Sequence, residues 1–280
     1  MRRIFLLFLA LITVSCVDWE HLFNREDEGE PEPEPVGPAV TEDGQLYNMD
    51  FDLWYRDGSY YECYGEGASR EQKNVWGSAN SSTAKLGRYT CVPESVFVAV
   101  PGPGKWAVKL KTQMVKFMFI KKLAAGSVFT GQMGSIEFSS LSATLKWGIP
   151  FSLRPKTLEG YACYKPVDIN VAKAPYDSLG GTLDKGHVFV LLTDWDRQFT
   201  VDPATETFVD IDNDTCIIGY GRVAFDRVMD DYEKFTIDID YRNDRTPRYV
   251  VIVASSSVYG DYFTGGEGST LFLDEFKFTY

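Results

Sequence analysis

The sequence predicts an all-β protein, a β-sandwich or jelly roll, from three observations. Short runs of β-branched and aromatic residues recur between turns rich in Gly, Pro, Asp and Ser. Several runs alternate apolar and polar residues, which is the period of a half-buried strand. From Gln45 onward no convincing amphipathic helix is found, and Phe and Tyr supply most of the 15% aromatic content. Many short strands with turn punctuation are typical of sandwiches and jelly rolls.

The predicted strands extend through the body of the chain. In 106–111, Trp, Val and Leu alternate with Ala and two Lys residues, and 235–241 alternates apolar residues with Thr and Asp. The segment 168–185 is rich in Asp, Gly and Lys and predicts a long surface loop. The strands are expected at residues 95–100, 106–110, 116–120, 187–192, 234–241, 249–254 and 270–280.

The first 15 residues have the layout of a secretory signal peptide. Two arginines follow Met1, residues 4–14 form a short apolar run, and the small residue Ser15 precedes Cys16. The run is shorter than the roughly 20 apolar residues that a transmembrane helix needs. The sequence therefore predicts export from the cytoplasm.

Residues 13–16, TVSC, resemble a bacterial lipobox, with Thr13 in place of the usual Leu. The resemblance implies that Cys16 is diacylated and anchors the protein to the outer membrane, at the cell surface or on the periplasmic face. A lipid anchor stabilises attachment by about 0.8 kcal/mol per buried CH₂. The alternative is plain secretion, with Cys16 in the discarded peptide. Residues 16–44, with alternating Glu and Pro, predict an extended acidic tether, and residues 45–280 predict one folded domain.

Composition limits the partners. The formal net charge is -12, which argues against nucleic acid or an anionic membrane surface, because both require clustered Lys and Arg. It suits a soluble surface domain that binds a neutral ligand or a cation. Membrane contact is therefore expected through the lipid anchor only.

Few catalytic motifs are present. Of the two His residues, His21 lies in the tether and His187 begins an apolar strand, so a structural role is expected for His187. The PGPGK segment 101–105 lacks the spacing of a P-loop and predicts a turn. A glycosidase needs two carboxylates about 5 to 9.5 Å apart. Acids that could serve, with no pair singled out, are Glu159, Asp194, Asp196, Asp202 and Asp238.

Four cysteines follow Cys16, and they are Cys63, Cys91, Cys163 and Cys216. An even number in an exported chain permits disulfides, with three possible connectivities. Buried free thiols are the alternative. No CxxC spacing indicates a metal site.

Six segments carry a resemblance to a known family. They are NMDFDLWY (48–55), PGPGKWAVKLKT (101–112), AAGSVFTG (124–131), GIPFSLRP (148–155), SSSVYGDYFTGGEGS (255–269) and LFLDEF (271–276). Together they resemble the putative carbohydrate metabolism domain found in lipoproteins of gut and oral Bacteroidetes. The resemblance covers 47–280 and implies a jelly roll similar to galactose-binding-like carbohydrate-binding modules. It also implies a place in glycan handling outside the cell.

The resemblance also suggests a structural calcium ion. In jelly-roll binding modules, an acid after the first strand and an Asp in the last strand commonly share calcium. Asp50, Asp52, Asp274 and Glu275 match that arrangement, and carboxylates with backbone carbonyls suffice for Ca²⁺. The alternative is that these are solvated turn acids. No organic cofactor is expected.

Exposed aromatic rings could form a platform for sugar, because sugars stack their C–H faces on Trp and Tyr. Core packing is the alternative for each ring. Trp76 and Trp195 are the strongest candidates for exposure, because both have polar neighbours. The full candidate set is Trp76, Trp147, Trp195, Tyr259 and Tyr262.

Three functions remain open. The first is a non-catalytic glycan-binding or glycan-associated surface lipoprotein, whose partner is an oligo- or polysaccharide. The second is a glycoside hydrolase with a carboxylate pair in a concave sheet. The third is a structural or adhesive protein that uses strand edges or an apolar patch to contact partners.

Overall fold

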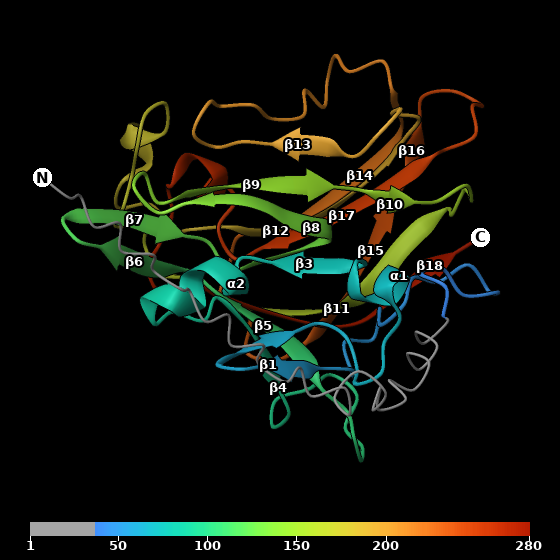
Figure 1. Ribbon diagram of the computed structural model, residues 1–280, viewed down its shortest axis with the longest axis horizontal. Helices are drawn as coiled ribbons and strands as arrows, with labels where there is room; N and C mark the ends of the chain where they lie inside the picture. The colour runs from blue at the N-terminus through green and yellow to red at the C-terminus, as the bar shows by residue number, and fades with distance from the viewer. Residues whose placement is uncertain (1–36) are drawn as a thin grey trace, which may run out of the picture. The chain divides into compact units, whose positions relative to one another are not determined.

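The computed structural model describes residues 37–280, which fold into two facing antiparallel sheets (Figure 1). The predicted all-β, jelly-roll sandwich is confirmed. Within the described residues, no helix is long and apolar enough to cross a membrane.

The smaller sheet has five strands. In spatial order they are β15 (Glu233–Asp238), β11 (Thr157–Lys165), β18 (Thr270–Thr279), β5 (Ala107–Lys111) and β4 (Cys91–Glu94). Strands that are neighbours in this sheet are mostly distant in sequence. The chain therefore crosses repeatedly between the two sheets.

The larger sheet has nine strands. Its main path is β13 (Phe199–Val201), β9 (Ser142–Trp147), β8 (Ser127–Glu137), β17 (Tyr249–Ser255), β12 (Gly186–Thr193), β14 (Ile217–Phe225) and β16 (Asp240–Tyr241). Two short strands complete it, β10 (Ile149–Pro150) on β17 and β3 (Trp76–Ser78) on β8.

Small elements surround the sheets. Two hairpins pair β1 (Tyr55–Asp57) with β2 (Tyr60–Glu62) and β6 (Gln113–Phe117) with β7 (Ile120–Ala124). The helical segments are short, namely α1 (Arg70–Lys73), α2 (Asn80–Thr83) and the 3₁₀ turns η2 (Ala84–Leu86), η3 (Asp177–Leu179) and η4 (Gly260–Tyr262).

The larger sheet is buried on both faces. Along β12, Val188 and Val190 point into the core between the sheets, whereas Phe189 and Leu191 point to the other face. That other face carries a second apolar core, to which β13 and the segment 202–216 also contribute side chains. Because both faces are covered, β12 is apolar along most of its length, as a central strand requires.

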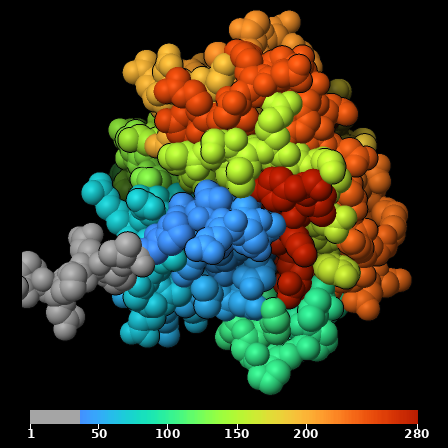
Figure 2. Space-filling model, turned by 90° about the vertical axis from the view of Figure 1, so that its right-hand side faces the viewer, coloured from blue at the N-terminus to red at the C-terminus, as the bar shows by residue number. Residues whose placement is uncertain are grey.

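The two ends of the domain meet. Phe278 of β18 exchanges two hydrogen bonds with the Gln45 side chain, at 3.1 and 2.7 Å. Figure 2 shows the blue residues that follow residue 37 beside the red end of β18. Val40 pairs with Leu46, so residues ahead of Gln45 join the folded unit.

Two predicted strands are wrong. Residues 95–100 form a loop, in which the Glu94 carboxylate accepts hydrogen bonds from the amides of Val96 and Phe97. Residues 116–120 contain the turn between β6 and β7, where Met118 has a φ of 52°. The apolar run 116–120 therefore lies at an exposed hairpin tip and does not form a buried strand. The loop predicted at 168–185 and the turn at 101–105 are confirmed.

Candidate functional site

A cleft lies on the outer face of the larger sheet, at the edge of the second apolar core. Its floor consists of two rows of side chains across β8, β17 and β12. Cross-strand partners point to the same face of a sheet, so the strand register determines which side chains form each row. The apolar row is Phe129, Val253 and Phe189, and the polar row is Ser127, Ser255 and His187.

Four segments form the walls of the cleft. They are the β6–β7 hairpin, the β8–β9 turn, α2 with η2, and the η4 segment. Gly260 allows η4 to approach closely, because a Cβ there would lie 2.4 Å from Ala125 Cβ. The cavity has a volume of about 150 Å³ and is mostly apolar. A cavity of that size holds one six-membered ring.

Three polar atoms of the cleft lining are buried and have no hydrogen-bond partner within residues 37–280. They are Thr83 Oγ1, Trp147 Nε1 and His187 Nδ1. Leaving a buried polar group unpaired costs about 1–3 kcal/mol. A hydroxyl both donates and accepts, so a hydroxylated ligand could supply the missing partners once a shift of the lining exposes these atoms.

The rings of Trp147 and His187 pack edge-on against the same phenylalanine. Their centroids lie 5.8 and 5.4 Å from the Phe189 centroid. Burial, together with the nearby Arg222, lowers the pKa of His187 to about 3. The imidazole is therefore neutral at physiological pH and offers a donor and an acceptor without charge.

Asp261 of η4 lies at the edge of the cleft. Burial raises the pKa of its carboxyl from 3.8 to about 6. The residue also borders a second cavity of about 400 Å³, which Lys122, Lys173 and Tyr262 help to line. Lys122 Nζ lies 4.0 Å from the centroid of the Phe263 ring, and burial followed by the charge of Lys173 lowers its pKa.

Among the predicted aromatic candidates, Trp147 is the one that lines the cleft, although its side chain is only 6% exposed and belongs to the second core. Trp76 is buried between Phe51 and Phe276, and its Nε1 donates to the Tyr47 carbonyl at 2.8 Å. The expected exposure of Trp76 is therefore wrong. Its ring has no free face for a sugar.

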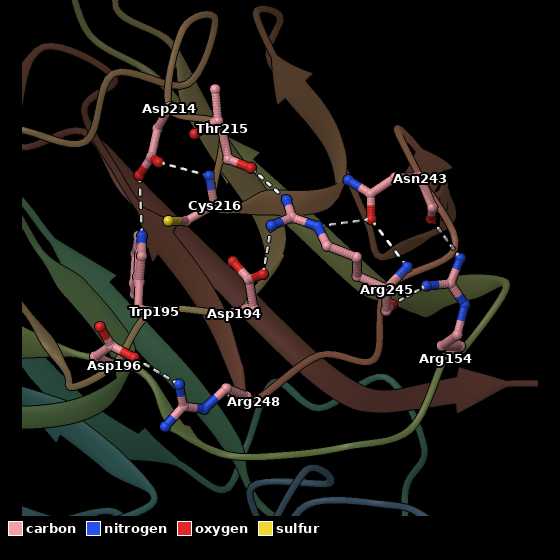
Figure 3. A network of polar contacts seen from close by, with 10 residues as sticks. All are labelled: Arg154, Asp194, Trp195, Asp196, Asp214, Thr215, Cys216, Asn243, Arg245 and Arg248. Atoms are coloured by element: carbon pink, nitrogen blue, oxygen red, sulfur yellow. Dashed lines mark hydrogen bonds and ion pairs between the residues drawn. The ribbon is translucent and has the colours of Figure 1, made fainter.

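The expected exposure of Trp195 is wrong for a different reason. Its Nε1 donates to Asp214 at 2.9 Å, and its neighbours Asp194 and Asp196 form ion pairs with Arg245 and Arg248 (Figure 3). The polar neighbours that suggested an exposed ring therefore form ion pairs with arginines at the surface. The indole itself is 7% exposed and belongs to the second core.

Tyr259 and Tyr262 lie beside the cleft and are partly buried. The Tyr176 ring packs on both, with centroid distances of 4.1 and 5.1 Å. Phe208 packs on the Tyr262 ring at 4.9 Å. This cluster packs the 168–185 loop and the segment 202–216 against η4, so the two tyrosines support the cleft wall.

The acids expected to bind calcium lie near one another, together with a lysine. Lys105 Nζ contacts Asp52 at 2.6 Å and Glu275 at 2.9 Å. Asp274 accepts from the Ala99 amide at 2.8 Å, while its Oδ1 is buried without a partner in residues 37–280. Over that range, no group of three or more His, Cys, Asp or Glu residues is arranged to hold a metal ion. Calcium binding by Asp50, Asp52 and Asp274 stays a prediction.

The acids considered for glycoside hydrolysis lie outside the cleft lining. Glu159 pairs with Lys234 at 2.8 Å, and Asp202 accepts from the Ala204 amide. Asp261 and Glu137 line the cleft instead. Sequence reasoning missed Asp261, although it lies between the two tyrosines that were selected in 255–269.

The four cysteines after Cys16 are free thiols in the described part of the chain. Cys63 and Cys91 are buried, with their Sγ atoms 4.0 Å apart. Cys163 Sγ donates to the Met229 carbonyl at 3.3 Å. Of the two alternatives, the structure therefore shows thiols.

Small-molecule sites in proteins are commonly clefts with a mostly apolar lining and a few polar groups, and this cleft has that form. The sequence then assigns the family. The chain belongs to the family described as "Putative carbohydrate metabolism domain", which it matches over residues 50–279. The resemblance noted from the sequence is therefore confirmed, and the chain is a carbohydrate-related domain.

Two solved structures share this fold. A putative glycoside hydrolase from Bacteroides thetaiotaomicron VPI-5482 is 21% identical, with 82% of this chain and 70% of that chain covered and a TM-score of 0.60. A putative glycoside hydrolase from Bacteroides vulgatus ATCC 8482 is 18% identical, with 81% and 89% covered and a TM-score of 0.53. Among curated proteins, none matches the chain.

Proposed function

We propose that this domain binds a glycan in the cleft over Phe129, Phe189 and Trp147. The observation that carries the proposal is the set of three unpaired buried polar atoms on Thr83, Trp147 and His187, three residues that line a mostly apolar cavity. Sugars combine apolar C–H faces with hydroxyls. The apolar lining of the cavity suits the former, and the polar row of Ser127, Ser255 and His187 suits the latter.

The sequence supports an extracytoplasmic place for this activity. A signal peptide and a lipidated Cys16 would hold the domain outside the cytoplasm on the 16–44 tether. An oligo- or polysaccharide at the cell surface would then be the ligand. The test is mass spectrometry of the mature N-terminus, which should show a diacylated Cys16. An unmodified mature N-terminus elsewhere would contradict lipidation.

Glycan binding is tested with residues 35–280 on a glycan array, followed by titration of the selected glycan. Trp147→Phe keeps an aromatic ring, although a smaller one, and removes the N–H, so affinity should fall about 3- to 10-fold. Trp195→Phe is the matched control, because its N–H bonds Asp214 outside the cleft. That control should lower stability and leave affinity unchanged. Equal affinity in both variants, or no binding to any glycan, would refute the proposal.

A second function, glycoside hydrolysis, is favoured by the presence of two acids in the cleft lining, Asp261 and Glu137. Burial raises the pKa of Asp261 to about 6, so part of the population keeps its proton near neutral pH and could act as a general acid. Incubation with the glycan selected by the array, followed by chromatography of products, distinguishes the two functions. Hydrolysis would give products that Asp261→Asn abolishes. Binding without products would support a binding domain.

A further inference from the structure

The tip of the β6–β7 hairpin exposes four consecutive apolar residues. Phe117, Met118, Phe119 and Ile120 are 37%, 69%, 95% and 38% exposed. The hairpin turn lies at the left edge of Figure 1, where it projects past the larger sheet. Single exposed apolar residues are common on protein surfaces, but a contiguous group marks a contact site.

Lysines bracket this tip. Lys116 and Lys121 are direct cross-strand partners, and Phe117 and Ile120 form the next pair toward the turn. Like charges directly opposite each other destabilise a sheet. Within residues 37–280, none of the ion pairs includes Lys116 or Lys121. Positive charge is thus concentrated here on a chain whose net charge is -12.

The base of the hairpin is fixed to the domain. Val115 and Leu123 are buried, at 5% and 1% exposure. The Phe117 ring lies 5.9 Å from the Phe138 ring of the β8–β9 turn. Packing at the base of the hairpin therefore holds the tip in a fixed position relative to the domain.

We propose that this hairpin tip docks on an anionic lipid surface. Its apolar side chains would enter the interface, while Lys116 and Lys121 would remain at the level of the phosphates. A protein partner is disfavoured by area, because a stable interface needs about 800 Å² from each side and four side chains supply less. The negative net charge of the whole chain opposes docking on an anionic surface. The interaction nevertheless depends most on the charges at the point of contact, and these are the lysines Lys116 and Lys121.

The site is independent of glycan binding. The tip residues 117–120 lie outside the lining of the cleft, and the hairpin residues that do line it, including Val115 and Leu123, are nearer the base. Failure of one proposal leaves the other intact. The tip would give the tethered domain a second, weak contact with the membrane that the predicted anchor at Cys16 already reaches.

The test is sedimentation of residues 35–280 with vesicles, which avoids any contribution from a lipid anchor. Vesicles of phosphatidylcholine mixed with anionic phosphatidylglycerol should bind the protein, and pure phosphatidylcholine should bind it less. Substituting Lys116→Gln with Lys121→Gln should lower partitioning about 30-fold. Phe119→Ser should also lower it. Added salt should weaken binding of the unmodified domain.

Matched controls use exposed residues elsewhere. Val96→Ser changes a valine that is 92% exposed, and Lys146→Gln with Lys277→Gln removes two exposed lysines. Both should leave sedimentation unchanged. No binding to anionic vesicles, or equal loss in the controls, would overturn the proposal. Self-association without lipid that Phe119→Ser abolishes would overturn it in favour of a second copy.

Discussion

Replacing Asp261 with Asn should change the pH dependence of stability. Burial raises the pKa of this carboxyl from 3.8 to about 6, so the native state keeps the proton where the unfolded chain has lost it. Stability is therefore lost as pH rises from about 4 through 6. At about 1.4 kcal/mol per pH unit, the loss is about 3 kcal/mol above pH 6. Because the side chain is partly exposed, this value is an upper limit.

Asn does not titrate, so the variant avoids this loss. Relative to the unmodified protein, Asp261→Asn should gain stability by up to about 2 kcal/mol more at pH 8 than at pH 4.5. Urea denaturation at both pH values measures the difference. Asp196→Asn is the control, since its carboxylate is 95% exposed, and it should change stability by less than about 0.5 kcal/mol at either pH. An Asp261→Asn effect that is equal at the two pH values would refute the reasoning.

Three further predictions concern the core, the thiols and the acidic cluster. Trp76→Ala should destabilise the domain by about 3–5 kcal/mol in urea denaturation, because the ring is buried; a change below about 1 kcal/mol would contradict its place in the core. A thiol-alkylating reagent should modify Cys216 in the folded domain before Cys63, Cys91 or Cys163, because Cys216 is partly exposed and the others are buried; peptide mass spectrometry detects the order, and earlier labelling of Cys63 or Cys91 would contradict their burial. Calcium at Asp52 must displace the Lys105 ammonium, so calcium should raise the Tm of Lys105→Gln more than that of the unmodified protein. Equal or absent shifts would contradict calcium binding there.

The sandwich was predictable because strand alternation is a local signal. The pattern in 106–111 and in 235–241 reports one buried and one exposed face. The same signal fails at 116–120, where apolar residues occupy an exposed turn. Apolar character alone does not tell a buried strand from an exposed contact site.

The cleft was harder to predict, because it depends on register between distant strands. Ser127, Ser255 and His187 share a row only because β17 pairs with both β8 and β12. Polar neighbours also misled the choice of tryptophans. Asp194 and Asp196 suggested exposure at Trp195, but both bind arginines that are about 50 residues away in sequence. Such partners cannot be read from local sequence.

The central claim is that Trp147 contacts a glycan, and its indole N–H can be observed directly. The measurement is the NMR spectrum of the ¹⁵N-labelled tryptophan side chains of residues 35–280 during titration with the glycan selected by the array. We predict that the Trp147 indole signal shifts saturably, while those of Trp76 and Trp195 stay in place. A glycan that binds without moving the Trp147 signal would contradict the account.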